Sequence, residues 1–113
     1  MASFLLRTTL PFAAIVLTAG IAAADAKTPL GQWMKANMGV AKAGQDYPTL
    51  QKDFDLVAGK APSGDYPQWA TIAKSGSAAS AKQDMAGVKA ACKQCHDAYQ
   101  EKYRKDFPTK PFP

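Results

Sequence analysis

The 113-residue sequence contains one histidine and two cysteines, and this scarcity excludes several kinds of site. A structural zinc site usually needs four Cys or His ligands, and three such residues are present. With no further cysteine, the chain has no disulfide framework. β-branched residues are few, and no stretch alternates between apolar and polar residues as a strand does. Alanine, lysine, glutamine and methionine, which favour helices, are plentiful, so we expect an all-α protein.

Arginine is also scarce, and no basic strip carries interleaved aromatic residues, so nucleic-acid binding is not expected. The net charge is nevertheless +5. Most of the lysines belong on a solvated surface. The excess of positive charge suits docking onto an acidic redox partner or substrate.

The N-terminus has the order of features that is typical of a secretory signal peptide. Arg7 precedes an apolar run from Leu10 to Ala24, which ends in small residues. Cleavage is expected after Ala24 or Ala26. The run is shorter than the ~20 residues of a membrane-spanning helix, so no span is expected after processing. We therefore predict a signal peptide at residues 1–26, a single exported domain at residues 27–113, and a periplasmic location.

Proline and glycine divide the mature chain into four segments with helical periodicity: residues 28–44, 46–58, 65–81 and 84–107. The connections are short enough for neighbouring helices to pack up and down. The sequence therefore predicts an antiparallel four-helix bundle.

Apolar residues recur at steps of three and four along the first and last segments, which defines a buried face on each. Leu30, Met34 and Met38 form this stripe on the first segment. On the last segment the stripe consists of Val88, Ala91, Cys92, Cys95, Tyr99 and Tyr103. The only two cysteines thus share the buried face of the C-terminal helix.

Residues Cys92–His96 read Cys-Lys-Gln-Cys-His, which is the haem c attachment motif. Cysteines three apart on a helix lie on one face, where both thiols can bond the vinyl groups of one haem. His96 is then carried beneath the porphyrin and can bind the iron axially. The signal peptide supplies the export that haem attachment requires.

Three other interpretations of the motif differ in strength. A thioredoxin-like pair belongs at a helix start after a strand, and no strand precedes Cys92. A structural zinc site lacks a fourth ligand. A simple disulfide between Cys92 and Cys95 is compatible with the spacing alone.

The second axial ligand has several candidates. With one histidine in the chain, bis-histidine ligation within a single chain is impossible. The remaining possibilities for the sixth position are Met34, Met38, Met85, a lysine or an open site. Methionines at helical spacing are, however, more often core residues than ligands. Met34 and Met38 lie one turn apart on the first helix, which can neighbour the last one in an antiparallel bundle.

Four large aromatic residues are candidate walls of the haem pocket: Trp33, Trp69, Tyr99 and Tyr103. The same residues are what a small, alanine-rich bundle needs for its core. Tyr99, one turn after His96, is the best candidate for direct contact with the haem.

The sequence resembles the class II cytochromes c, the group of cytochrome c′ and cytochrome c556. The similarity is greatest over Ala90–Tyr99 and extends more weakly to Trp33-Met34-Lys35, Asn37-Met38-Gly39 and Trp69. The resemblance implies a periplasmic four-helix bundle with one haem c held by Cys92 and Cys95 on the C-terminal helix.

In the c556-like branch a first-helix methionine is the sixth ligand and the protein carries electrons, and Met34 matches that position better than Met38. In the c′ branch the site is open and binds nitric oxide or carbon monoxide. The resemblance also implies redox partner proteins of a respiratory or periplasmic chain, and a monomer or a homodimer. The mature chain is shorter than usual for the family, and Gln100 stands where a basic residue is common, which weakens the transfer of gas chemistry.

We therefore expect a one-electron carrier with His96 and Met34 as axial ligands and no substrate turnover. The alternatives are a five-coordinate gas-binding haem protein and a haem-free helical interaction protein.

Overall fold

The computed structural model describes residues 28–113, so the predicted signal peptide at residues 1–26 lies outside the described residues. Within residues 28–113 the chain forms helices and no strand, which confirms the expected all-α class. The helices are α2 (Pro29–Met34), η1 (Lys35–Gly39), α3 (Val40–Ala43), α4 (Tyr47–Ala58), α5 (Trp69–Ala81), α6 (Met85–Cys95), η2 (His96–Gln100) and α7 (Glu101–Asp106). Because η1 and η2 are π-helical turns within longer helices, these elements make up four helical segments.

Side-chain caps fix the start of three segments. The backbone N–H of Gly31 donates to Thr28 Oγ1 (3.0 Å), and Asp46 and Asp84 accept equivalent bonds at the starts of α4 and α6. Each bond satisfies an amide that has no partner within the helix. The predicted cap at Asp84 is thus confirmed.

The third segment begins later than its sequence predicts. We expected it to start near Asp65, but α5 begins at Trp69. The residues before it form a turn in which the N–H of Trp69 donates to the carbonyl of Tyr66 (3.2 Å). Tyr66 is 5% exposed, and its ring contacts those of Trp69, Tyr99 and Tyr103. Burial of this ring takes Tyr66 out of the helical register.

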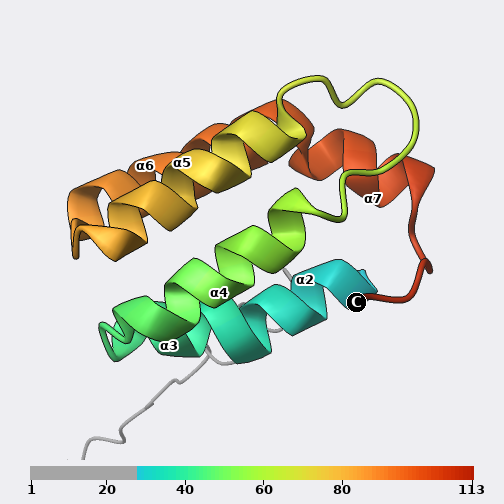
Figure 1. The fold of residues 1–113 in the computed structure, drawn as a ribbon. Coiled ribbons are helices and arrows are strands. Elements are labelled where there is room, and N and C mark those ends of the chain that lie inside the picture. The colour runs from blue at the N-terminus through green and yellow to red at the C-terminus, as the bar shows by residue number, and fades with distance from the viewer. Residues whose placement is uncertain (1–27) are drawn as a thin grey trace, which may run out of the picture.

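The packing is closest between α4 and α5 and between α5 and α6, which lie side by side (Figure 1). At Gly76, an added Cβ would lie 2.3 Å from Phe54 Cε1, so the glycine lets α5 approach the Phe54 ring of α4. Buried side chains from all four segments form the core, among them Leu30, Leu50, Phe54, Val57, Ile72, Val88 and Ala91.

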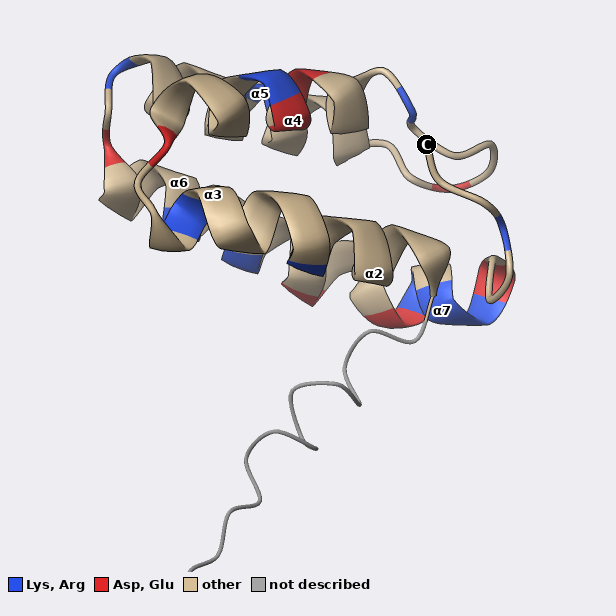
Figure 2. Cartoon of the chain, turned by 90° about the horizontal axis from the view of Figure 1, so that it is seen from below, with Lys and Arg blue, Asp and Glu red and all other residues tan. Residues whose placement is uncertain are grey.

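The first and last segments lie on the same side of the molecule in Figure 2, and they line common cavities without close backbone packing against each other. After α7 the chain returns towards α2, where the ring of Phe112 contacts that of Trp33, with 4.9 Å between ring centroids. This arrangement places the buried stripe of the first segment and the motif-bearing stripe of the last one around a common space.

Candidate functional site

A cavity of about 470 Å³, here called the main cavity, is lined by residues from all four helical segments. Its volume falls within the roughly 300–1,000 Å³ that is typical of cofactor and ligand sites. A smaller cavity of about 50 Å³, the side cavity, has Gly31, Met34, Cys95, His96 and Gln100 in common with it. The two cavities therefore form one site between the first and last helices.

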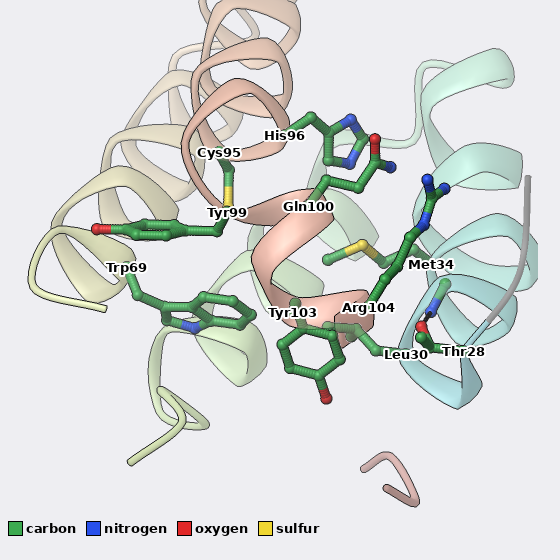
Figure 3. Close-up of a pocket in the computed structure, with 11 residues that line it drawn as sticks. Thr28, Leu30, Met34, Trp69, Cys95, His96, Tyr99, Gln100, Tyr103 and Arg104 are labelled. Atoms are coloured by element: carbon green, nitrogen blue, oxygen red, sulfur yellow. Dashed lines mark hydrogen bonds between the residues drawn. The ribbon is translucent and has the colours of Figure 1, made fainter. Parts of the chain in front are cut away.

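All three motif residues line the main cavity. Cys92 and Cys95 lie three residues apart on α6, and both are half-buried with free thiols. His96 follows at the start of η2, and its exposed ring also lines the side cavity, as Figure 3 shows. One helix face thus presents two thiols and an imidazole to the same space.

The two thiols are protonated at neutral pH. Burial raises the pKa of Cys95 to about 11, with the neighbouring Cys92 adding to the effect. Burial also raises the pKa of Cys92, although the charge of Lys42 opposes the increase. Binding of a bare metal ion by these thiols would require thiolates, which this environment disfavours. Between residues 28 and 113, no group of three or more His, Cys, Asp and Glu side chains could hold a metal ion.

The imidazole of His96 is kept neutral. Partial burial and the positive charges of Lys42 and Arg104 lower the pKa of His96, while Asp97 acts in the opposite direction. A neutral imidazole keeps a nitrogen lone pair available for coordination. His96 is therefore in the protonation state that an axial ligand needs.

Both candidate methionines reach this site from the first helix, but they differ in position. Met34 is half-buried and lines both cavities, as His96 does, and Figure 3 shows its side chain reaching into the space from α2. Met38 is 8% exposed and lines the main cavity but not the side cavity. Met34 thus has more of its surroundings in common with His96 than Met38 has.

Two short π-helical turns interrupt the helices at this site. η1 contributes Lys35, Met38 and Gly39 to the lining, and η2 contributes His96 and Gln100. Such turns are rare in proteins and are frequent at functional sites, because the extra residue in the turn redirects side chains. Here they occur in the first and last helical segments, two of the four that line the main cavity.

The cavity has an apolar floor and a cationic lining. The floor consists of five side chains from α4 and α5: Leu50, Phe54, Val57, Ile72 and Ala73. The charged residues that line the two cavities are Lys35, Lys42 and Arg104, and no Asp or Glu lines either one. Such a site complements a largely apolar molecule that carries negative groups.

The four predicted aromatic residues separate into two groups. Trp69, Tyr99 and Tyr103 line the side cavity with His96, so the prediction of pocket walls fits their positions. Trp33 lines neither cavity. Its ring packs against Phe112 instead, beside the C-terminal tail.

Sequence reasoning missed the residues that come from other helices. The steps of four and three along Leu50, Phe54 and Val57 indicate a buried face, but they do not indicate that it faces a cavity. Lys42 carries no signal in the sequence, because its role depends on its position relative to His96. The π-helical turns have no recognised sequence pattern either.

Comparisons with known proteins returned nothing: no family model, no curated protein and no solved structure matches the chain. Within the described part of the chain, no helix has both the length and the apolar character needed to cross a membrane.

Proposed function

We propose that this protein is an exported c-type cytochrome that carries single electrons, with one haem c bound covalently through Cys92 and Cys95. His96 and Met34 would be the two protein ligands of its iron. One observation carries the proposal: two thiols, a neutral imidazole and a thioether line a single cavity of cofactor size.

The residues that line the main cavity fit this cofactor. Each protonated thiol would add its S–H bond across one vinyl group, which forms a thioether without any change in net oxidation state. The apolar floor would exclude water from the porphyrin face. Lys35, Lys42 and Arg104 would lie near the propionates and offset their charge.

The bound iron would supply the redox chemistry, since it alternates between ferric and ferrous states by gain or loss of one electron. Ligation by Met34 together with His96 would favour the ferrous state and raise the potential. No protein group needs to transfer a proton in this role, so the residues around the cavity bind and orient rather than react.

The proposal includes an antiparallel four-helix bundle with haem on its C-terminal helix, a signal peptide and a periplasmic location. Its partners would be acidic redox proteins of a respiratory or periplasmic chain, matched to the net charge of +5. The protein would act as a monomer or a homodimer.

Mass spectrometry of the protein from a host that exports it and matures haem tests the attachment. We expect a haem-sized increment that is lost in Cys92→Ala/Cys95→Ala, together with a mass that places the cleavage site after Ala24 or Ala26. A full-length chain without the increment in such a host would contradict the proposal and favour a haem-free interaction protein.

Optical spectra of the purified protein test the axial ligands. We expect a far-red methionine–iron charge-transfer band in the ferric protein and weak binding of carbon monoxide by the ferrous protein. Met34→Ala should remove the band and give high-spin iron, whereas Met38→Ala should keep it. A high-spin wild type that binds carbon monoxide readily would instead establish a five-coordinate gas-binding protein.

A further inference from the structure

Five aromatic rings form a continuous cluster that extends away from the side cavity. Trp69, Tyr99 and Tyr103 line that cavity, and Tyr66 contacts all three at centroid distances of 5.2–6.5 Å. Phe107 lies beyond, 6.1 Å from Tyr66 and 5.2 Å from Tyr103. Rings at these separations are in van der Waals contact, so an electron can pass between neighbours without crossing open space.

The hydroxyl groups of the cluster have different partners. Tyr66 donates to Asp106 Oδ2 at 2.9 Å, and Lys102 Nζ binds the same carboxylate oxygen at 2.9 Å. Tyr99 Oη accepts a bond from the backbone N–H of Gln68 at 2.7 Å. The cluster contains three tyrosines. Among them, as far as residues 28–113 show, only Tyr66 has a hydroxyl that donates to a carboxylate.

This distinction matters because a phenol that loses an electron becomes a very strong acid. The proton must then have a base within hydrogen-bond reach, and a carboxylate is such a base while a backbone amide is not. Lys102 lies over the ring of Tyr66, with Nζ 4.8 Å from the centroid, and its charge disfavours a positively charged ring. Oxidation of Tyr66 is therefore favourable when the proton leaves together with the electron.

Trp69 is in the opposite situation. Its buried Nε1–H donates to the carbonyl of Val57 at 2.8 Å, and a carbonyl does not retain a proton in place of the indole. An oxidised Trp69 keeps its proton and remains a cation, which is a stronger one-electron oxidant than a neutral tyrosyl radical. A neighbouring aromatic side chain can reduce this Trp69 cation by donating one electron.

We propose that Tyr66 is a redox-active tyrosine, which gives one electron to oxidised Trp69 and its phenolic proton to Asp106. The products are neutral Trp69, a neutral Tyr66 radical and a protonated Asp106, so charge and electrons balance. The initial oxidant is an external one-electron oxidant, of the class of small inorganic or oxygen radicals, that takes one electron from Trp69. The cluster thereby moves an oxidising equivalent away from the cavity and its thioether and imidazole groups.

The step can be tested without any chemistry at the cavity, so that its failure is separate from failure of the proposed function. The chain has two tryptophans, and Trp33→Phe leaves Trp69 as the only one. Pulse radiolysis of this mature protein with azide radical oxidises Trp69, and transient absorption then follows the tryptophan radical as it converts into a tyrosyl radical. We expect conversion at a rate that is independent of protein concentration and slower in deuterated water.

Three variants made in the Trp33→Phe background separate the contributions. Tyr66→Phe should abolish the rapid conversion. Asp106→Asn should slow it by at least about tenfold, the equivalent of one lost charge-assisted hydrogen bond. Tyr103→Phe is the matched control, because its ring stacks on Trp69 at 5.8 Å without a carboxylate, and it should leave the rate unchanged.

Circular dichroism should show the same helical content in all four proteins. A conversion that persists in Tyr66→Phe, or that Tyr103→Phe slows as much as Tyr66→Phe does, would overturn the proposal. An unchanged rate in both Asp106→Asn and deuterated water would also overturn it, because the proton would then not be part of the step.

Discussion

Gly76 is the position at which the packing makes the sharpest prediction, because α5 approaches the ring of Phe54 there. A Cβ at Gly76 would lie 2.3, 2.5 and 2.6 Å from three atoms of that ring, distances that real Cβ contacts do not reach. Phe54 is 4% exposed and forms part of the cavity floor, so the ring has little room to move except towards the cavity. We therefore expect Gly76→Ala to destabilise the fold.

Two effects of opposite sign set the magnitude. Alanine gains about 1 kcal/mol over glycine inside a helix. Overpacking costs about 1–3 kcal/mol. Overlap with three ring atoms, each closer than 3.0 Å, favours the upper end although the ring can shift towards the cavity. The net loss is then about 2 kcal/mol. For a domain of this size, that corresponds to a fall in Tm of roughly 8–16 °C.

Urea denaturation followed by circular dichroism measures this loss. Gly39→Ala is the matched control, because the nearest atom to its added Cβ, the carbonyl oxygen of Met34, lies at an ordinary 3.6 Å. It should be neutral or stabilising by up to about 1 kcal/mol. Phe54→Leu should recover part of the loss when combined with Gly76→Ala, since it removes the overlapping ring atoms. A Gly76→Ala protein as stable as the wild type would refute the packing argument.

Three further predictions concern single polar groups. Burial raises the pKa of Asp53 above its ordinary 3.8, and its Oδ2 is buried without a hydrogen-bond partner among residues 28–113. The wild type therefore gains stability as pH falls through the raised pKa. Asp53→Asn should remove this gain and stabilise the protein on the order of 1 kcal/mol at neutral pH in denaturant titrations. Equal stability of the two proteins across that pH range would contradict the prediction. Thr28→Ala should cost about 1 kcal/mol through loss of the helix cap while Thr28→Ser costs less, and equal losses would exclude a capping role. Trp69→Phe should cost about 2 kcal/mol in the same assay, because the buried carbonyl of Val57 loses its donor, and a loss below about 0.5 kcal/mol would contradict this.

Much of the secondary structure could be predicted because it depends on local physics. The spacing of apolar residues and the proline and glycine breaks predicted four helical segments. The cap at Asp84 was identified correctly from its residue type and position. The start of α5 was predicted wrongly at Asp65, because burial of Tyr66 among rings from α5, η2 and α7 overrides the local preference. A contact with residues more than thirty positions away leaves no local pattern.

The amino-acid sequence alone sets the chemistry available at the site: two thiols and the chain's one imidazole at fixed helical spacing, and methionines on the first helix. Helix geometry alone places Cys92 and Cys95 on one face, so no tertiary information is needed for that pairing. Tertiary packing sets which side chains from the other segments lie next to this face. Packing between segments brings Met34 and Lys42 to the motif, places the ring of Trp33 against that of Phe112 and brings the Tyr66 hydroxyl to Asp106. These contacts depend on where separate helices pack against one another. That packing is determined jointly by side chains along the whole chain, so it leaves no local sequence pattern.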